Sequence, residues 1–418
     1  MHHFQHKNQE LHAEEVPVRE LARVYGTPLY VYSAATLRRH FRAYDSAFHR
    51  VRHLTCFSMK CNSNLSLLRL LEREGAGADI VSGGELAKAL EAGIAPEKIV
   101  FSGVGKQYWE MTYALETGIL MFNVESQQEM DLLSQAAQDT GIPARMSLRI
   151  NPDVDPGTHP YISTGLKKNK FGVAIDLAPE LYKRAGEDPW LEPVGIDCHI
   201  GSQLTQISPF LESLQRLKDL YARLQDMGLS IDYLDLGGGL GITYGEEDPP
   251  HPGELGEALS QALGDMDITL ILEPGRVIAG NAGIMVTRAL YTKETELKHF
   301  TVVDAAMNDL IRPSYYGAYH RIAEVAPQGR EVAARDVVGP ICETGDFLAQ
   351  DRELPRIEPG ELLAVFSAGG YGFAMASQYN SRPRGAEVMV DGDKAWLIRE
   401  RETVEEMIAP EKRLLERE

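Results

Sequence analysis

The chain has 418 residues, of which 44% are hydrophobic, 25% charged and 8% aromatic, and its formal net charge is −19. This length exceeds what one hydrophobic core usually serves, so two domains are expected. The acidic balance argues against nucleic acid and anionic membranes as partners, because both are bound through basic surfaces. No apolar stretch is long enough to span a bilayer. Four scattered cysteines without a C-x-x-C pair fit a reducing cytoplasm and predict neither a disulfide framework nor a structural metal site.

The first residues, MHHFQHKNQELH, lack the apolar core of a signal peptide. We expect them to form a disordered or tag-like leader. The segment TPLYVYS (27–33) is strand-like and precedes the regular part of the chain. It is expected to pair with strands that come much later in the sequence.

Between about residues 50 and 280, eight short apolar segments alternate with helix-like ones. The candidate strands are 53–60, 77–84, 99–103, 120–126, 145–151, 194–201, 233–239 and 269–275. Glycines stand where the intervening helices should end. The pattern predicts a (β/α)8 TIM barrel over residues 36–281, although spacing alone leaves a doubly wound sheet open.

Alternation along these strands sorts apolar side chains to one face and polar ones to the other. The polar face becomes richer towards the C-terminal end of each strand, where barrel enzymes hold their active sites. The pattern therefore predicts a ring of polar side chains at one mouth of the barrel, formed by Lys60, Asp79, Arg149, His199 and Glu273.

After about residue 282 the sequence is rich in strand-like runs without regular helices. Residues 1–35 and 282–418 are therefore expected to form a second, mainly antiparallel domain resembling a β-sandwich or β-barrel. Asp391 and Gly392 provide a hairpin signal within it.

Lys60 follows the apolar segment around Leu54, Phe57 and Met59. A buried ammonium without a partner costs several kcal/mol. The lysine could reach solvent or pair with Asp79, or its amine could be used covalently as a Schiff base. The position alone does not decide between these interpretations.

The sequence LDLGGGLGI (234–242) places three successive glycines at a strand end. A dinucleotide fingerprint would require glycine where Ile242 stands, so that interpretation is disfavoured. The backbone N–H groups of such a run can hold a phosphate, although a simple tight turn is also possible. Gly275 in EPGR and the hydroxyl of Ser202 after the sixth strand favour the phosphate site.

Other candidates have ordinary structural explanations. Glu273 and Arg276 could form an ion pair, His199 could be a core histidine, and Cys342 could be a buried inert thiol. Taken together, however, a lysine, backbone phosphate donors, a carboxylate and an imidazole match pyridoxal 5′-phosphate. That cofactor needs a Schiff-base lysine and a carboxylate at its ring nitrogen.

The chain resembles the pyridoxal phosphate-dependent decarboxylases with an alanine racemase-like barrel, and among them the diaminopimelate decarboxylases. The resemblance covers nearly the whole chain. Its motifs are FSMKCN, VSGGEL, HPYISTGLKKNKFG, CHIGSQ, DLGGGLG, EPGR, NDLIRPSYYGAYH, CETGD and GGYGF.

The resemblance implies a role for each matched residue. Lys60 would bind the cofactor covalently with Asp79 close by, His199 would stack on the pyridine ring and Glu273 would contact its nitrogen. Residues implied to hold the phosphate are Ser202, Gly238, Gly239, Gly275, Arg276 and Tyr371. Those implied to bind substrate are Arg276, Arg312, Tyr316, Glu343 and Tyr371, with Cys342 as proton donor.

The resemblance also implies the reaction and the assembly. The substrate would be meso-2,6-diaminoheptanedioate, decarboxylated at its D-centre to L-lysine in the cytoplasm. Cys342 and Glu343 would come from the partner chain of a homodimer. Two departures from the family pattern, Cys61 and Thr344, remove no catalytic group. Alternatives are a related decarboxylase acting on ornithine, arginine or a carboxylated polyamine, a racemase, and a catalytically silent binding protein.

Overall fold

The computed structural model describes residues 2–154 and 170–415. The chain divides into two compact units. Residues 40–243 and 247–278 form the barrel unit, and residues 1–39, 244–246 and 279–418 form the β unit. Among the described residues, no helix is both long enough and apolar enough to cross a membrane.

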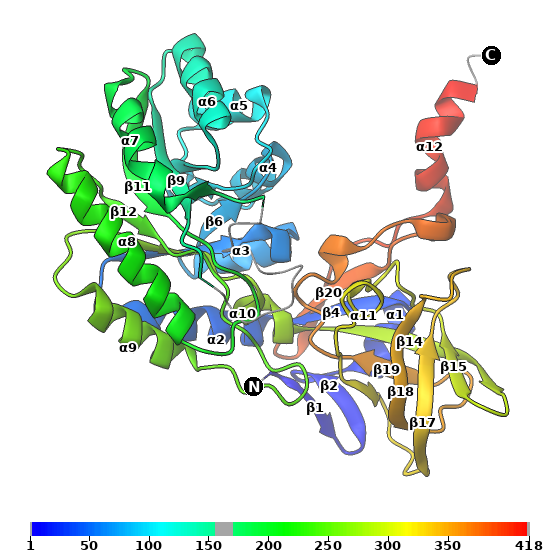
Figure 1. Ribbon diagram of the computed structural model, residues 1–418. Coiled ribbons are helices and arrows are strands. Elements are labelled where there is room, and N and C mark those ends of the chain that lie inside the picture. The colour runs from blue at the N-terminus through cyan, green and yellow to red at the C-terminus, as the bar shows by residue number, and fades with distance from the viewer. Residues whose placement is uncertain (1, 155–169, 416–418) are drawn as a thin grey trace. The chain divides into compact units, whose positions relative to one another are not determined.

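Eight parallel strands close into a barrel in the barrel unit (Figure 1). Their order around the barrel is β9, β11, β12, β13, β5, β6, β7 and β8, and β8 pairs with β9 to complete the ring. The strands are β5 (His53–Ser58), β6 (Gly77–Ile80), β7 (Ile99–Phe101), β8 (Met121–Val124), β9 (Ala144–Asn151), β11 (Leu191–Asp197), β12 (Tyr233–Asp235) and β13 (Thr269–Leu272). A short strand, β10 (Val173–Ala174), pairs in parallel with β9. Closure rules out the doubly wound sheet and confirms the predicted barrel.

Helices follow the strands around the barrel (Figure 1). They are α2 (Ala34–Asp45), α3 (Leu65–Arg73), α4 (Gly83–Glu91), α5 (Tyr108–Thr117), α6 (Gln127–Thr140), α7 (Ala178–Glu187), α8 (Ser208–Asp226), α9 (Pro252–Leu263) and α10 (Arg276–Ala279). Two of these helices begin at a serine that caps them: Ser82 accepts from the N–H of Glu85 at the start of α4, and Ser126 accepts from the N–H of Glu129 at the start of α6. Such caps satisfy backbone donors that the first helical turn leaves open.

The barrel interior is layered. An apolar layer contains Cys56, Val100, Leu120, Met121 and Ile271. Polar residues occupy the C-terminal ends of the strands above this layer. Strands such as β5 end earlier than the sequence pattern predicted. β5 stops at Ser58, because Met59–Cys61 turn into a 3-10 helix that carries Lys60.

The β unit contains a three-stranded sheet and a nine-stranded, mostly antiparallel sheet. The first has β1 (Phe4–Lys7), β2 (Glu10–Ala13) and β3 (Val16–Pro17). The second has β4 (Leu29–Ser33), β14 (Gly283–Glu294), β15 (His299–Val303), β16 (Ile322–Glu324), β17 (Val332–Val338), β18 (Phe347–Pro355), β19 (Leu362–Val365), β20 (Ala386–Asp391) and β21 (Lys394–Arg399). The helices are α1 (Val18–Tyr25), α11 (Arg312–Tyr316) and α12 (Val404–Leu415).

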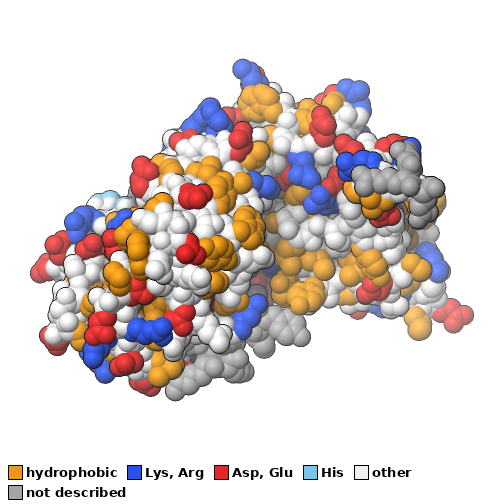
Figure 2. Space-filling view, turned by 90° about the horizontal axis from the view of Figure 1, so that it is seen from above, with side chains coloured by type: hydrophobic (Ala, Val, Ile, Leu, Met, Phe, Trp, Pro, Cys, Tyr) orange, Lys and Arg blue, Asp and Glu red, His pale blue; other side chains and the backbone are white. Residues whose placement is uncertain are grey.

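Two sequence expectations for this unit are confirmed. β4 pairs with β14 and β20, so the early segment does join strands from the far end of the chain. β20 and β21 form the hairpin signalled by Asp391 and Gly392. Figure 2 shows acidic and basic side chains interspersed over the described surface of the face in view.

The expectation of a disordered leader is wrong. β1 and β2 pair in antiparallel register, and Phe4, Leu11 and Ala13 are buried in the hydrophobic core of the β unit. The pattern is hard to recognise in the sequence because histidine and other polar residues separate only a few apolar ones. Burial of those few apolar side chains holds the hairpin in place.

Candidate active site

Lys60 lies just beyond the C-terminal end of β5. Its Nζ is 2.7 Å from Oδ2 of Asp79, which follows from the pairing of β5 with β6. Asp79 is fully buried, whereas 37% of the Lys60 side chain is exposed. Oδ1 of Asp79 has no hydrogen-bond partner among the described residues. The amine is therefore held by an acid and remains reachable from solvent.

His199 follows β11 and is oriented by the glycine run after β12. The N–H of Gly238 donates to Nδ1 of His199 over 3.1 Å, which leaves Nε2 as the protonated nitrogen of a neutral ring. Burial, and then the charges of Arg149 and Lys60, hold the pKa of His199 well below its usual value. At Gly237, where φ is +62°, a Cβ atom would lie 2.5 Å from Nδ1. The sequence thus presents a neutral, fixed imidazole.

The glycines also let neighbouring strand ends approach closely. A Cβ atom at Gly238 would lie 2.2 Å from the carbonyl oxygen of Glu273, and one at Gly239 2.5 Å from that of Gly201. A Cβ atom at Gly275 would lie 3.0 Å from Cβ of Cys61. The close approach of these strand ends therefore requires glycine at each of these positions.

Arg276 begins α10 and is buried. Its Nη2 and Nε donate to Oγ of Ser202 over 3.0 and 3.3 Å. The structure thus brings together a guanidinium and a hydroxyl from the loops after β13 and β11. Arg276 thus donates to the hydroxyl of Ser202, whereas Glu273 accepts from Ser102 and Asn123 inside the barrel.

Glu273 is buried among polar side chains that the sequence argument did not single out. Its Oε1 accepts from Oγ of Ser102 over 3.2 Å and from Nδ2 of Asn123 over 3.4 Å. Burial and the nearby Asp235 and Asp79 raise the pKa of Glu273 well above its usual value. Strand alternation could have found Asp235, because it lies on the inward face of β12, but the sequence argument did not use it.

Arg149 belongs to the same interior, as the ring prediction required. Its Nη1 is 3.0 Å from Oε1 of Glu125, and its guanidinium lies over the ring of Phe171 at 4.7 Å. Glu125 also accepts from the N–H of Gly172 over 2.9 Å. Phe171 and Gly172 are the last residues of the motif HPYISTGLKKNKFG, whose residues 159–169 lie outside the described part of the chain.

Five of the predicted site residues belong to the β unit: Arg312, Tyr316, Cys342, Glu343 and Tyr371. The Arg312 guanidinium is buried between the rings of Tyr244 and Tyr316, at 5.1 and 5.6 Å from their centroids. Its Nε is 3.4 Å from Nε2 of His320. Sequence reasoning singled out neither Tyr244 nor His320, although His320 ends the motif NDLIRPSYYGAYH, because both contacts with Arg312 depend on the fold.

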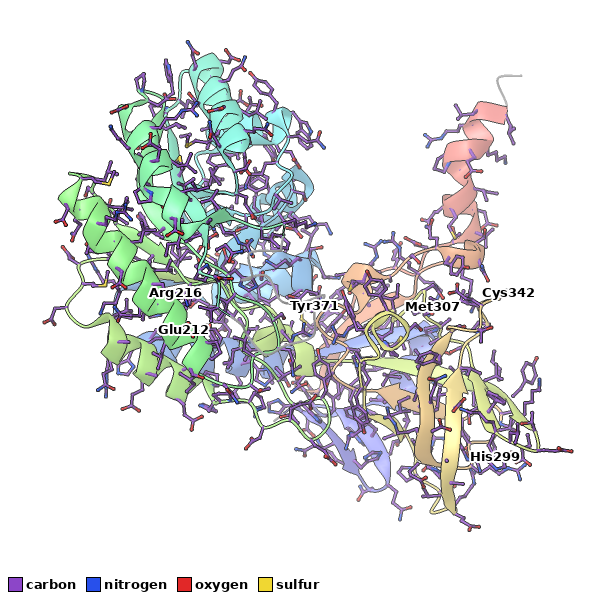
Figure 3. The ribbon with its side chains drawn as sticks, viewed as in Figure 1. Glu212, Arg216, His299, Met307, Cys342 and Tyr371 are labelled. Atoms are coloured by element: carbon purple, nitrogen blue, oxygen red, sulfur yellow. The ribbon has the colours of Figure 1, made fainter. Side chains whose placement is uncertain are left out.

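Cys342 is exposed, so the interpretation of a buried inert thiol is wrong. Its backbone N–H donates to Oδ1 of Asn380 over 2.9 Å, and the hydroxyl of Tyr379 donates to Oε2 of Glu343 over the same distance. Tyr371 has a φ of +55°. Figure 3 shows Tyr371 and Cys342 well apart within this unit.

The residues of the barrel unit fit pyridoxal phosphate. A reachable amine is paired with a buried acid, a neutral imidazole is fixed beside it, and Glu273 offers a carboxyl group in an interior with more acids than bases. The positive charge of a protonated ring nitrogen would offset this excess of acidic over basic side chains. The closed barrel and this set of groups define a pyridoxal phosphate-dependent enzyme of the barrel class.

Comparison with known proteins identifies the family. Residues 34–280 match the family described as "Pyridoxal-dependent decarboxylase, pyridoxal binding domain". A diaminopimelate decarboxylase of Pseudomonas aeruginosa is 54% identical over 98% of both chains, and one of Aquifex aeolicus is 52% identical over 98% of this chain and 97% of the relative. The crystal structure of diaminopimelate decarboxylase from Helicobacter pylori, complexed with L-lysine, has a TM-score of 0.92 at 43% identity, covering 95% and 99% of the two chains. The chain belongs to the diaminopimelate decarboxylases.

Proposed function

We propose that this enzyme decarboxylates meso-2,6-diaminoheptanedioate at its D-centre, releasing CO2 and L-lysine in the last step of lysine biosynthesis. The observation that carries the proposal is the amine of Lys60, which is held by buried Asp79 at the barrel mouth yet remains exposed. Family membership supports the same reaction. The scattered free thiols support a cytoplasmic location.

Pyridoxal phosphate, when bound, supplies an electron sink for the charge left by CO2 loss. Lys60 is proposed as its covalent anchor, with Asp79 holding the amine in place. Neutral His199 would offer a flat face to the ring, and Glu273 a carboxyl group to its nitrogen. Proposed phosphate ligands are Ser202, Gly238, Gly239, Gly275, Arg276 and Tyr371.

Substrate selection is proposed to rest on the β unit. A guanidinium can bind a carboxylate with two parallel hydrogen bonds, and the Arg312 guanidinium lies over two tyrosine rings, those of Tyr244 and Tyr316. Arg312, Tyr316, Arg276 and Tyr371 would bind the carboxylate end that ornithine lacks. Glu343 would bind the distal ammonium, and Cys342 would donate the proton that replaces CO2.

We infer that Cys342 and Glu343 act in the site of a partner chain. Tyr371 and Cys342 lie well apart in the β unit (Figure 3), which supports their serving different active sites. If Tyr371 binds the phosphate in its own chain, Cys342 must serve another chain. A homodimer with two shared sites satisfies both roles.

The covalent role is tested with Lys60→Ala. The variant should lose both the visible absorbance of the bound cofactor and CO2 release from meso-diaminopimelate. Lys98→Ala is a matched control, because Lys98 is an exposed barrel lysine that donates to the carbonyl of Gly75. Retention of absorbance and activity by Lys60→Ala would disprove the role.

Substrate and assembly need separate measurements. Product analysis with meso-diaminopimelate, ornithine and arginine should yield CO2 only from the first. Mixing inactive Lys60→Ala and Cys342→Ala chains should restore about a quarter of native activity, since half of the dimers are mixed and each has one complete site. No recovery after subunit exchange would place each site within one chain.

A further inference from the structure

His320 is a fully buried histidine of the β unit, and its ring lies against the guanidinium of Arg312. The helix that carries Arg312, α11, ends at Gly317, whose φ of +61° lets the chain leave the helix. The carbonyl oxygen of His320 then accepts from Nη1 of Arg352 over 2.8 Å. The backbone of His320 is therefore held in place beside Arg312.

The hydrogen-bond partners of His320 determine its tautomer. Nδ1 lies 2.8 Å from the carbonyl oxygen of Phe366, and a carbonyl oxygen can only accept, so Nδ1 carries the proton. Nε2 lies 3.4 Å from Nε of Arg312, and a guanidinium can only donate, so Nε2 accepts. A neutral ring satisfies both contacts, whereas a charged imidazolium would turn an N–H group towards the N–H group of Arg312.

Three neutral groups contact the buried guanidinium of Arg312. One is the imidazole of His320, and the others are the rings of Tyr244 and Tyr316, whose centroids lie 5.1 and 5.6 Å from Cζ. The ring of Tyr244 also packs edge to face against His320, with centroids 5.3 Å apart. All four residues belong to the β unit. These three contacts hold the guanidinium without neutralising its positive charge.

We propose that His320 is a positioning residue for substrate selectivity, which occupies Nε of Arg312 and so reserves Nη1 and Nη2 for the distal carboxylate of the substrate. This inference rests on the proposed function, in which Arg312 binds that carboxylate. A guanidinium can bind a carboxylate through Nη1 and Nη2, or through Nε and one Nη. The contact with His320 excludes the second geometry. Because bidentate binding aligns two N–H groups at once, a fixed orientation of Arg312 strengthens it.

The two halves of the imidazole ring separate this role from a purely structural one. Asparagine has an N–H group where Nδ1 lies, so His320→Asn keeps the bond to Phe366 but does not reach Arg312. Glutamine is longer, and in His320→Gln its oxygen can accept from Arg312 in place of Nε2. A structural role through Phe366 predicts that glutamine is the harmful substitution, whereas the proposed role predicts that asparagine is.

The test uses two ligands that differ by one carboxylate. L-Lysine, the proposed product, keeps the distal carboxylate of meso-diaminopimelate, and 1,5-diaminopentane lacks it. Calorimetric titration of the holoenzyme measures Kd for each ligand without turnover. In His320→Asn, Kd for L-lysine should rise by on the order of tenfold, the usual effect of losing a hydrogen bond to a charged group, while Kd for 1,5-diaminopentane stays the same. His320→Gln should recover most of the affinity for L-lysine.

Steady-state kinetics provide a second readout. KM for meso-diaminopimelate should rise by a similar factor in His320→Asn with little change in kcat, because the distal carboxylate is bound equally before and during CO2 loss. His49→Asn is a matched control, since His49 is an exposed histidine of the barrel unit whose Nδ1 donates to the carbonyl oxygen of Ser46 over 2.9 Å. It should leave the affinity for both ligands unchanged.

Native affinity for L-lysine in His320→Asn, or an equal loss of affinity for both ligands, would overturn the role of His320. A loss in His320→Gln as large as that in His320→Asn would also overturn it. Absence of CO2 release from meso-diaminopimelate by the native chain would instead overturn the proposed function.

A measurement on the native holoenzyme covers the case in which the variants do not fold. The 15N spectrum of the histidine side chains at neutral pH should show His320 with a proton on Nδ1 and none on Nε2. A proton on Nε2 would overturn the inference, because that nitrogen could then not accept from Arg312.

Discussion

At the scale of single residues, two side chains of a short turn hold the groups proposed to meet the substrate. Asn380 and Tyr379 lie next to each other in the 3-10 turn Tyr379–Ser381, and they bond to Cys342 and Glu343 respectively. Asn380 holds the cysteine by its backbone, which leaves the thiol exposed. The turn therefore orients both groups without using up the thiol.

Tyr379→Phe removes only the hydroxyl that binds Glu343. A hydrogen bond to a charged group at an exposed site contributes roughly 1 kcal/mol, so KM for meso-diaminopimelate should rise roughly 3- to 10-fold with kcat almost unchanged. Steady-state kinetics measure both constants. Tyr108→Phe is the control, since Tyr108 donates to Asp139 on the barrel surface over 2.6 Å. Equal kinetics in the two variants would show that Tyr379 does not orient Glu343.

Gly238 tests the close approach of strand ends. Alanine there would place Cβ 2.2 Å from the Glu273 carbonyl oxygen, so backbone must move, at a cost of roughly 1–3 kcal/mol. Because His199 is held by the Gly238 N–H, cofactor affinity should fall as well. Equilibrium titration with pyridoxal phosphate and urea unfolding measure the two effects. Gly105→Ala, at a glycine with nothing within 4 Å of a Cβ atom, should change neither.

At the scale of secondary-structure elements, a buried ion pair fastens the loop after β7 to the start of α6. Lys106 and Glu129 are 2.7 Å apart, and only 1% and 8% of their side chains are exposed. Lys106 also donates to the carbonyl oxygens of Gly103 and Asn123, and Glu129 accepts from the N–H of Glu125. The pair thereby supports two residues, Asn123 and Glu125, whose side chains face the site.

Lys106→Met should destabilise the barrel unit by about 3–5 kcal/mol, because it leaves Glu129 buried without its cation. Adding Glu129→Gln should recover part of that loss, since the buried charge disappears. Urea unfolding of the single and double variants measures the difference. A double variant less stable than Lys106→Met would show that the carboxylate is needed for its backbone contact rather than for the lysine.

The sequence anticipated the elements better than their ends. All eight barrel strands were found because apolar runs alternate with helices, and alternation placed Lys60, His199 and Glu273 at one mouth. It could not show that Met59 starts a turn, because strand ends depend on how neighbouring strands close the barrel. Asp235 was visible in LDLGGG but looked like part of the glycine motif. The bond from Tyr379 to Glu343 has no local signal at all.

At the scale of the whole molecule, the barrel interior gathers acidic side chains, among them Asp197, Asp235 and Glu273. The net charge of −19 predicted the absence of a basic binding face, but it said nothing of where acids are buried. Asp197, Asp235 and Glu273 all have a pKa raised first by burial and then by one another. Folding therefore makes this chain take up protons.

That uptake gives the stability of the cofactor-free protein a definite pH dependence. Burial and Asp197 raise the pKa of Asp235 to about 8, against about 4 in the unfolded chain. Between these values the folded state binds a proton that the unfolded state does not, so the free energy of unfolding falls as pH rises, by up to about 1.4 kcal/mol per pH unit for one group. Below pH 4 both states are protonated, and above pH 8 both are ionised.

Denaturant unfolding of the cofactor-free protein should therefore show falling stability from pH 6 to pH 8. Asp235→Asn should reduce the slope by about one proton, because its amide does not titrate. Asp139→Asn changes an exposed acid on the barrel surface and should leave the slope unchanged. A slope in Asp235→Asn equal to that of the native chain would mean that Asp235 is ionised in the folded barrel, and the charge of the cluster would then have to be balanced through Asp197 and Glu273.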